Sequence, residues 1–576
     1  MKNRYIILSI LLMLALLTAV VMALPKFDVQ SQSTASSYVE KVFVQNKVSK
    51  VDIQLEESDL QLILDNPTEK EVVPATVVVN GTEVQDVGFR VKGNMTLHSV
   101  AQSDSDRYSF KIDFDYYNDG QNLYGLQKLA LNNNYSDSTF SREYLSYKLM
   151  DEMGIATPAN SYMYVTINGE EYGLYLGVEA IDETFLANDF DDATGDLYKP
   201  DGTGSDLQWI SEDIEDYTGL DLKTNEETSD QSAMMKLLDV INNGGELEDV
   251  VDVDEVLRYF AVNTALVNLD HYQGSMKHNY YLYEENGMFS ILPWDYNMSF
   301  GGFGGGGMGG GQGNNQEIPP MQNDQSQEES EAAMQQAGPG GGDMGAGMES
   351  NFLSDSMINF SITNPVSGTT LEERPLLNAL LENDTYRERY EAYLEQIATT
   401  FFTEENMTTM TSQISALILP YVEADPMKFT TTEQFLKGIS GDESLVAFAT
   451  KRADSILKQL SGELMIEAEE NSMQPNNNQA AERPNAFPGN GQLPEGMEDE
   501  GFPADFQPPG DGQRPNGMNE EGGFPANGQP PEMGTEDALN GSVSAVDRQT
   551  LLLSGGSVGL LVTALILVWK FRRRGI

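Results

Sequence analysis

Apolar and polar residues alternate over short stretches in the first third of the chain, which is the pattern of half-buried β-strands. These stretches are VDIQL (51–55), ATVVVNGTEVQDVGFRVKG (75–93), YSFKIDFDY (108–116) and SYMYVTINGEEYGLYLGVEAI (161–181). The Asn168-Gly169 pair predicts a tight hairpin turn inside the last stretch. Between the strands, residues 139–153 have an amphipathic helical pattern, and Gly154 is a plausible C-cap for that helix.

Helical periodicity dominates from Asp182 onward. Residues 255–270 predict a strong helix that delivers Asp270 at its end. Residues 278–295 (HNYYLYEENGMFSILPWD) predict a further hairpin that turns at 285–287, and helical patterns return from about 371 to 465. A strand-rich first part and a helix-rich second part predict an α+β protein.

Three stretches have compositions that set them apart from the folded domain. Residues 25–45 read as a leader or linker, and the Gly/Met/Gln-rich residues 301–350 predict a disordered insertion within a folded domain at 46–465. Residues 466–545 are rich in Pro, Gly, Asn and acidic residues, with fifteen Asp or Glu and two Arg between 467 and 540. Such a composition predicts an extended, self-repelling stalk.

Both ends of the chain are apolar. Residues 1–24 predict a signal peptide or an uncleaved N-terminal anchor. Residues 551–569 carry no charge and predict a transmembrane helix, followed by a basic tail at 570–576. The positive-inside rule then places that tail in the cytoplasm and the folded domain outside. The alternative for each apolar run is a buried core helix.

The formal net charge is −56, and the chain has no cysteine. The charge argues against nucleic acid as a partner, because binding phosphates requires Lys and Arg that release counterions. The lack of cysteine excludes thiol nucleophiles, thiolate metal sites and disulfides. The acidity favours cation binding and basic protein partners, although the predicted stalk holds much of the charge.

Three polar residues around the 278–295 hairpin are the main candidates for chemistry. Asp270 follows an apolar helix, while Asn279 opens the hairpin and Asp295 closes it. Amide and carboxylate oxygens at the open end of one hairpin would suit Mg²⁺. Asp, Asn and Asp in this order is the arrangement of base and metal ligands in protein-kinase-like phosphoryl transfer. A helix terminator, a turn residue and a calcium loop are the respective alternatives for the three residues.

Seven segments of the chain match one known family. They are RVKGNMT (90–96), YSFKIDF (108–114), LNNNYSDSTFSREYLSYKLMDEMGI (131–155), YVTINGEEYGLYLGVEAID (164–182), GDLYKP (195–200), LDHYQGSMKHNYYLY (269–283) and ILPWDYNMSFGG (291–302). On these segments the chain resembles the spore coat protein H (CotH) family, which are atypical protein kinases with a much altered kinase fold. Over about residues 48–460 the resemblance implies an atypical bilobal protein-kinase-like fold, with a strand-rich N-lobe and a helical C-lobe.

The resemblance implies that Asp270 is the catalytic aspartate and that Asn279 and Asp295 bind metal. It also implies ATP and Mg²⁺ (or Mn²⁺) as cofactors. One residue departs from the pattern: many members are expected to carry a second acid after the PWD motif, and this chain has Asn297 there. Because a neutral amide binds Mg²⁺ more weakly than a carboxylate, one metal site is expected to be weak or absent.

Five further residues are candidates for contacts to the nucleotide. Lys111 lies mid-strand, as the ATP-contacting lysine of a kinase does, and is preferred over Lys92, which lies in a Gly-containing turn. Arg90 is a third candidate for phosphate contacts, and a solvated strand position is the alternative for Lys111. Glu143, early on the 139–153 helix, could pair with such a lysine. Glu179 follows a hairpin, where a kinase hinge would contact adenine.

These expectations describe an extracytoplasmic, membrane-anchored CotH-like kinase that transfers phosphate from ATP to Ser or Thr of secreted or surface proteins. Basic, Ser/Thr-rich proteins are the expected substrates, and the C-terminal helix is the expected contact with the membrane. The alternative is a catalytically inactive protein that serves as a surface-displayed binding, adhesion or cell-envelope structural protein. The predicted stalk and anchor fit display, whereas the intact site residues favour an enzyme.

Overall fold

The computed structural model describes residues 36–303 and 352–466. All of them belong to one compact unit, Met1–Ala480, and a second unit, Ala481–Ile576, lies wholly outside the described residues. The predicted stalk and both apolar ends lie outside them too, as does nearly all of the predicted insertion. Within the described part of the chain, no helix is both long and apolar enough to cross a membrane.

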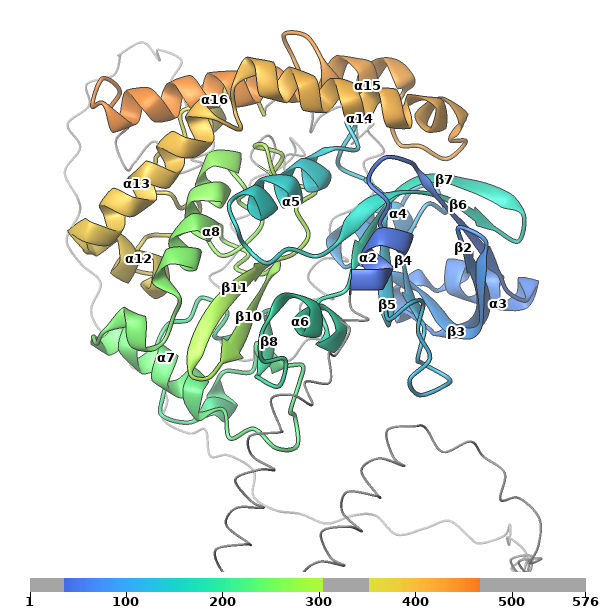
Figure 1. Cartoon of the computed structure of the whole chain (residues 1–576), viewed down its shortest axis with the longest axis horizontal. Helices are drawn as coiled ribbons and strands as arrows, with labels where there is room; N and C mark the ends of the chain where they lie inside the picture. Colours follow the sequence, from blue (N-terminus) through green and yellow to red (C-terminus); the bar gives the residue numbers. More distant parts are fainter. Residues whose placement is uncertain (1–35, 304–351, 467–576) are drawn as a thin grey trace, which may run out of the picture. The chain divides into compact units, whose positions relative to one another are not determined.

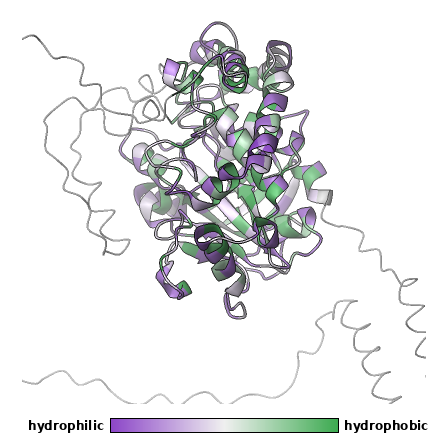
Figure 2. Ribbon diagram, turned by 90° about the vertical axis from the view of Figure 1, so that its left-hand side faces the viewer, coloured by the Kyte–Doolittle hydropathy of each residue, from purple (hydrophilic) through white to green (hydrophobic). Residues whose placement is uncertain are grey.

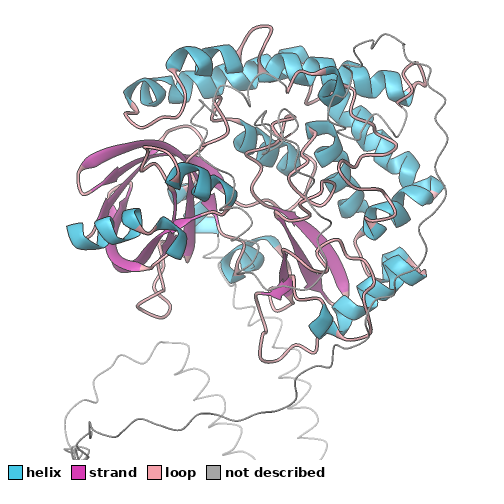
Figure 3. Ribbon diagram, turned by 180° about the vertical axis from the view of Figure 1, so that it is seen from behind, coloured by secondary structure: helices cyan, strands magenta, loops and turns pink. Residues whose placement is uncertain are grey.

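The strands form two sheets. Their bounds are β1 Ser49–Gln54, β2 Val73–Val79, β3 Thr82–Lys92, β4 Ser109–Asp113, β5 Lys128–Asn132, β6 Asn160–Ile167, β7 Glu170–Glu179, β8 Leu197–Pro200, β9 Leu220–Leu222, β10 Tyr280–Glu285 and β11 Met288–Pro293. The first sheet is a closed barrel in the order β1-β2-β3-β4-β5-β7-β6, and the second has the order β11-β10-β8-β9 (Figures 1 and 3).

Alternation along the barrel strands places apolar side chains inside and polar ones outside. Phe89 and Phe110 stack in the barrel core with ring centroids 5.0 Å apart. Their neighbours Arg90 and Lys111 are opposite each other in the β3–β4 register and therefore share the outer face. Parallel pairing of β1 with β6 closes the barrel, and all its other strand pairs are antiparallel.

Every regular element that the structure describes after β11 is a helix. The α-helices are α2 Ser36–Val42, α3 Glu57–Asp65, α4 Met95–Ala101, α5 Arg142–Glu152, α6 Glu183–Asp189, α7 Ser232–Asn243, α8 Val253–Leu266, α11 Asp355–Ile358, α12 Pro375–Glu382, α13 Asp384–Thr399, α14 Glu404–Ala424, α15 Thr432–Ile439 and α16 Leu445–Leu460; short 3₁₀ helices lie at Pro67–Glu69, Ile214–Asp216 and Leu247–Asp249. Helix α13 packs against α8 and α16, and apolar residues concentrate inside this region (Figure 2). We call α8 together with α11 to α16 the helical region.

The observed elements confirm the α+β class, with a β-rich N-terminal region and a helical C-terminal region. Two boundaries differ from the prediction. Part of the predicted 25–45 linker forms α2, whose Tyr38 is fully buried, so folded structure begins before residue 46. Helix α8 ends at Leu266, four residues before Asp270, because Val267 adopts a left-handed conformation with φ 48° that stops the helix.

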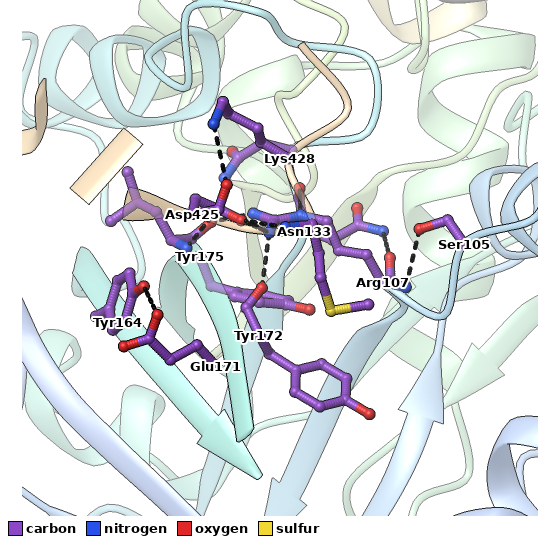
Figure 4. A network of polar contacts seen from close by, with 12 residues as sticks. Ser105, Arg107, Asn133, Tyr164, Glu171, Tyr172, Tyr175, Asp425 and Lys428 are labelled. Atoms are coloured by element: carbon purple, nitrogen blue, oxygen red, sulfur yellow. Dashed lines mark hydrogen bonds and ion pairs between the residues drawn. The ribbon is translucent and has the colours of Figure 1, made fainter. Parts of the chain in front are cut away.

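A buried ion pair fastens the helical region to the barrel (Figure 4). Asp425 caps the C-terminus of α14, and its carboxylate lies 2.8 Å from the guanidinium of Arg107, which precedes β4. Both side chains are fully buried. The same carboxylate accepts a hydrogen bond of 2.8 Å from the backbone N–H of Leu174 in β7. A Cβ on the neighbouring Gly173 would lie only 2.1 Å from the Asp425 carboxyl carbon, so glycine is required for this close approach.

Candidate active site

The β10–β11 hairpin brings Asn279 and Asp295 together at its open end, as predicted. The last paired residues are Tyr280 and Pro293; Asn279 lies one residue outside that pair and Asp295 two residues outside it. Asn279 and Asp295 both adopt left-handed backbone conformations, with φ of 57° and 56°. Asn and Asp tolerate this conformation better than most residues, because their short side chains hydrogen-bond locally. The hairpin thus sets the position of both residues.

Asp270 lies in the loop between α8 and β10 and is nearly fully buried. Its carboxylate oxygen Oδ1 lies 2.9 Å from His278 Nε2. The side-chain amide of Asn279 donates to the other carboxylate oxygen, Oδ2, at 3.1 Å and to the Asp270 carbonyl at 2.9 Å. Burial, and next the charge of Asp295, raise the pKa of Asp270, although these hydrogen bonds act in the opposite direction. A carboxylate with a raised pKa is a better proton acceptor at neutral pH.

The burial of His278 lowers its pKa, but the hydrogen bond and charge of Asp270 outweigh that effect, and its pKa is raised overall. The hydrogen bond from the His278 ring to the Asp270 carboxylate therefore holds that carboxylate in one orientation. Sequence reasoning gave His278 no role, because a histidine on a loop has no distinguishing pattern. Its position directly before Asn279 is the only available signal.

A polar network joins the barrel to Asp295. Lys92, the last residue of β3, donates a hydrogen bond to the side chain of Asn132 in β5. Asn132 in turn donates to the Glu143 carboxylate at 2.8 Å, and Tyr147 donates to the other Glu143 oxygen at 3.0 Å. The backbone N–H of Asp295 donates to the Tyr147 hydroxyl at 3.1 Å. Four chain segments thus converge on one site.

Lys92 is the candidate lysine that the structure brings to Glu143 and Asp295. Burial lowers the pKa of the Lys92 ammonium, while the charges of Asp295 and Glu143 counteract that effect. Burial raises the pKa of Glu143 to about 7, with the charge of Asp295 as the next cause. Glu143 reaches Lys92 through Asn132 rather than by a direct ion pair. The predicted pairing of Glu143 with a lysine therefore takes an indirect form, in which an amide relays the contact.

Arg90 and Lys111 lie on the same outer face of the barrel but further from the hairpin. Lys111 is paired in register with Arg90 on β3 and with Ala130 on β5. Burial, and then the charge of Arg90, lower the pKa of Lys111 to about 8. Arg90 donates to the Val91 carbonyl at 2.9 Å, and burial lowers its pKa. Crowded, partly desolvated cations of this kind favour an anionic ligand at this face.

Glu179 is not brought together with the other candidates. It ends β7, and its carboxylate accepts a hydrogen bond from the Tyr38 hydroxyl and one of 3.0 Å from the Ala159 backbone N–H. Both carboxylate oxygens therefore serve to hold α2 and the start of β6 against the barrel. Adenine binding at this hinge position stays a prediction, and the Glu179 side chain has a structural use in the fold.

We expect Glu179 to make stability pH-dependent. Burial raises the pKa of Glu179 from an ordinary value of 4.5 to about 8, so the folded chain binds more protons than the unfolded chain between these two values. The free energy of unfolding should therefore fall as pH rises through this window, by up to about 1.4 kcal/mol per pH unit. Glu179→Gln mimics the protonated carboxyl and should remove this slope.

Denaturant unfolding of the wild type and Glu179→Gln at pH 5, 6, 7 and 8 would measure the difference in slope. Glu171→Gln is the matched control, because Glu171 lies on the same strand with an exposed side chain. Equal slopes for the wild type and Glu179→Gln would show that the Glu179 carboxyl is not held protonated.

Residues 365–374, which follow the gap at 304–351, hold the loop that carries Asp270 in place. The buried guanidinium of Arg374 donates to the carbonyls of Tyr272 and Gly274. Gln273 of the loop donates to the Pro365 carbonyl at 2.6 Å, and its own carbonyl accepts from Ser367 at 3.1 Å. Nothing in the sequence marks Arg374, because its partners lie about a hundred residues earlier in the chain.

The donor set fits a hard cation. The side-chain oxygens of Asp295 and Asn279 accept no hydrogen bond from any residue that the structure describes, so they are free to bind a ligand. Among residues 36–303 and 352–466, no group of three or more His, Asp or Glu side chains is placed to hold a metal. In phosphoryl-transfer sites the protein usually supplies Mg²⁺ with only one or two oxygen ligands. Water molecules and phosphate oxygens supply the other ligands.

Comparison with known proteins assigns the chain to a family. The family model described as "CotH kinase protein" matches residues 89–456, which is more than half of the chain and includes every candidate residue. The chain belongs to the CotH family. The Inner spore coat protein H of Bacillus subtilis (strain 168) is 28% identical over 255 residues, which cover 42% of this chain and 66% of the relative.

A second relative in the same organism, an Inner spore coat protein H-like protein, is 31% identical over 75 residues. That match covers 13% of this chain and 23% of the relative. The chain thus spans slightly less than two thirds of the first of these CotH relatives and about a quarter of the second.

Proposed function

We propose that this CotH-family chain is an extracytoplasmic, membrane-anchored protein kinase that transfers the γ-phosphoryl group of ATP to Ser or Thr of secreted or surface proteins. The observation that carries the proposal is the carboxylate of Asp295, which accepts no hydrogen bond from the described residues and whose charge raises the pKa of both Lys92 and the buried Asp270. In this proposal the barrel serves as the N-lobe of an atypical kinase fold, and the helical region serves as its C-lobe.

The residues divide the chemistry among them. Asp270 accepts the proton of the substrate hydroxyl as the hydroxyl oxygen attacks the γ-phosphorus. The bond between the γ-phosphorus and the oxygen that bridges it to the β-phosphate breaks, which releases ADP. His278 and Asn279 hold the Asp270 carboxylate in place during this step. Lys92 binds phosphate oxygens, supported by Glu143 through Asn132. Mg²⁺ or Mn²⁺, held by Asp295 and Asn279, would supply neutralisation of phosphate charge.

Transfer of labelled phosphate from ATP would test this proposal on the full-length chain with a basic, Ser/Thr-rich protein as acceptor. Asp295→Asn should abolish metal-dependent ATP binding, because it removes the charged ligand, and should lower transfer by about 10³-fold. Asp254→Asn is a suitable control, because Asp254 forms an ion pair with Arg258 on α8 and lies outside the site. If the wild type neither binds ATP nor transfers phosphate, the kinase proposal is wrong.

The rival is a protein that keeps the fold, binds or is displayed at a surface, and has no transferase activity. One observation favours it: Asn297 replaces the second acid expected after the PWD motif. Binding of ATP by the wild type without transfer to any acceptor, or to itself, would support this alternative.

A further inference from the structure

A lysine of the second sheet faces the same site as Lys92. Lys199 lies in β8, paired in register with Asp221 of β9, and its ammonium lies 5.7 Å from the centre of the Tyr281 ring in β10. The Tyr281 ring contacts Trp294, with ring centroids 5.9 Å apart. Lys92 lies 5.5 Å from the centre of the Trp294 ring. Two aromatic rings thus lie between a barrel lysine and a sheet lysine.

The ammonium of Lys199 has no anionic partner of its own. It donates no hydrogen bond to, and forms no ion pair with, any residue in the described part of the chain, although its side chain is half-buried. Burial lowers the pKa of Lys199, and Lys92 is the next cause, so the two ammoniums repel each other. The charge of Asp295 acts favourably on both lysines. Two desolvated cations beside one free carboxylate are stabilised when a multiply charged anion binds between them.

We propose that Lys199 is a second polyphosphate-binding residue, which contacts the phosphate chain of a nucleoside triphosphate from the side opposite to Lys92. This inference rests on the proposed function, since it assumes that the nucleotide binds between the barrel and the second sheet. The face of the Tyr281 ring holds the Lys199 ammonium by a cation–π contact and so fixes the position from which it would bind phosphate. Because both lysines contact the phosphate chain, the affinity for a nucleotide should rise with its number of phosphates.

Calorimetry on the full-length chain would test the proposal, with Mg²⁺-ATP, Mg²⁺-ADP and AMP as ligands. Lys199→Met should weaken Mg²⁺-ATP binding by about 10- to 100-fold, as expected for the loss of a charge-assisted contact, and should change AMP binding by less than about twofold. Lys199→Arg keeps the charge and should retain most of the ATP affinity.

Lys223→Met is the matched control, because Lys223 lies just after β9, pairs with Asp221 and is more exposed. It removes a neighbouring positive charge without removing a phosphate contact, so it should change ATP affinity by less than about threefold. Thermal melting of each variant reports folding independently of binding.

The outcomes separate the inference from the proposal on which it rests. If Lys199→Met binds ATP as tightly as the wild type, or loses AMP and ATP affinity equally, Lys199 is not a phosphate-binding residue. If Lys199→Met does not fold, the folded Lys199→Arg variant decides: a loss of more than about tenfold in its ATP affinity, matched by an equal loss in its AMP affinity, would overturn the inference. If the folded wild type binds no nucleotide, the kinase proposal itself is wrong and the inference is wrong with it.

Discussion

Replacing Asp270 with asparagine is expected to lower phosphoryl transfer by about 10²- to 10⁴-fold, the usual range for loss of a general base. Asparagine keeps the size of the side chain and retains an oxygen that can accept from His278, but it cannot take up the substrate proton. The raised pKa of Asp270, caused chiefly by burial, suits that task at neutral pH. Because Asp270 binds no phosphate in this mechanism, ATP affinity should change by less than about threefold.

Steady-state kinetics and calorimetry on the same preparation would separate these two effects. Asp206→Asn is the matched control, because Asp206 forms an ion pair with Lys277 of the same loop. Removing that ion pair loosens the loop but leaves the Asp270 carboxylate in place. We expect the control to keep at least about a tenth of the wild-type rate. A similar loss in both variants, or full activity of Asp270→Asn, would contradict the role of Asp270 as the base.

Hairpins were the most predictable part of the fold, because their turns carry local chemistry. Asn168-Gly169 and Asn286-Gly287 all have positive φ, as a two-residue hairpin turn requires, and the predicted hairpins match β6–β7 and β10–β11. The end of α8 was not predictable in the same way. Val267 adopts a left-handed conformation, which β-branched residues disfavour, so only tertiary contacts explain it.

The candidate site likewise has a part that the local sequence predicts and a part that only tertiary contacts decide. Asp270, Asn279 and Asp295 are close in sequence around one hairpin, so pattern reasoning placed them together, and the structure does so too. The residues that complete the site come from distant segments, and their choice depends on register. Lys92 and Lys111 share one face of the barrel, and a strand pattern alone cannot tell which of them lies nearer to the hairpin.

The contacts that hold the loops in place had no sequence signal. Arg374 and the Arg107–Asp425 pair join segments separated by about a hundred to three hundred residues. A buried arginine cannot be told from an exposed one in a polar stretch of sequence, because burial depends on what the rest of the chain brings over it. These residues decide how the barrel and the helical region are fastened, and only the folded chain identifies them.

Replacing Asp425 with alanine is expected to destabilise the fold by about 3–5 kcal/mol, as is typical for removing one partner of a buried ion pair. The variant leaves the Arg107 guanidinium fully buried without a counter-charge (Figure 4). It also removes the acceptor for the Leu174 and Met427 backbone N–H groups. Arg107 would keep its hydrogen bonds to backbone carbonyls, such as that of Tyr172 at 2.8 Å. These neutral acceptors satisfy its donors but do not compensate its charge.

Denaturant unfolding of the full-length chain would measure this loss. The double variant Arg107→Met with Asp425→Leu should recover much of the stability, because the cost lies in the unpaired charge rather than in the absence of the pair. Asp454→Ala is the control for a solvent-exposed pair, since Asp454 and Lys458 are one turn apart on α16 and we expect their ion pair to contribute little at high salt. A loss below about 1 kcal/mol for Asp425→Ala would show that the pair is incidental. A large loss that the double variant reverses would instead show that the cost comes from the uncompensated charge of the buried Arg107 guanidinium.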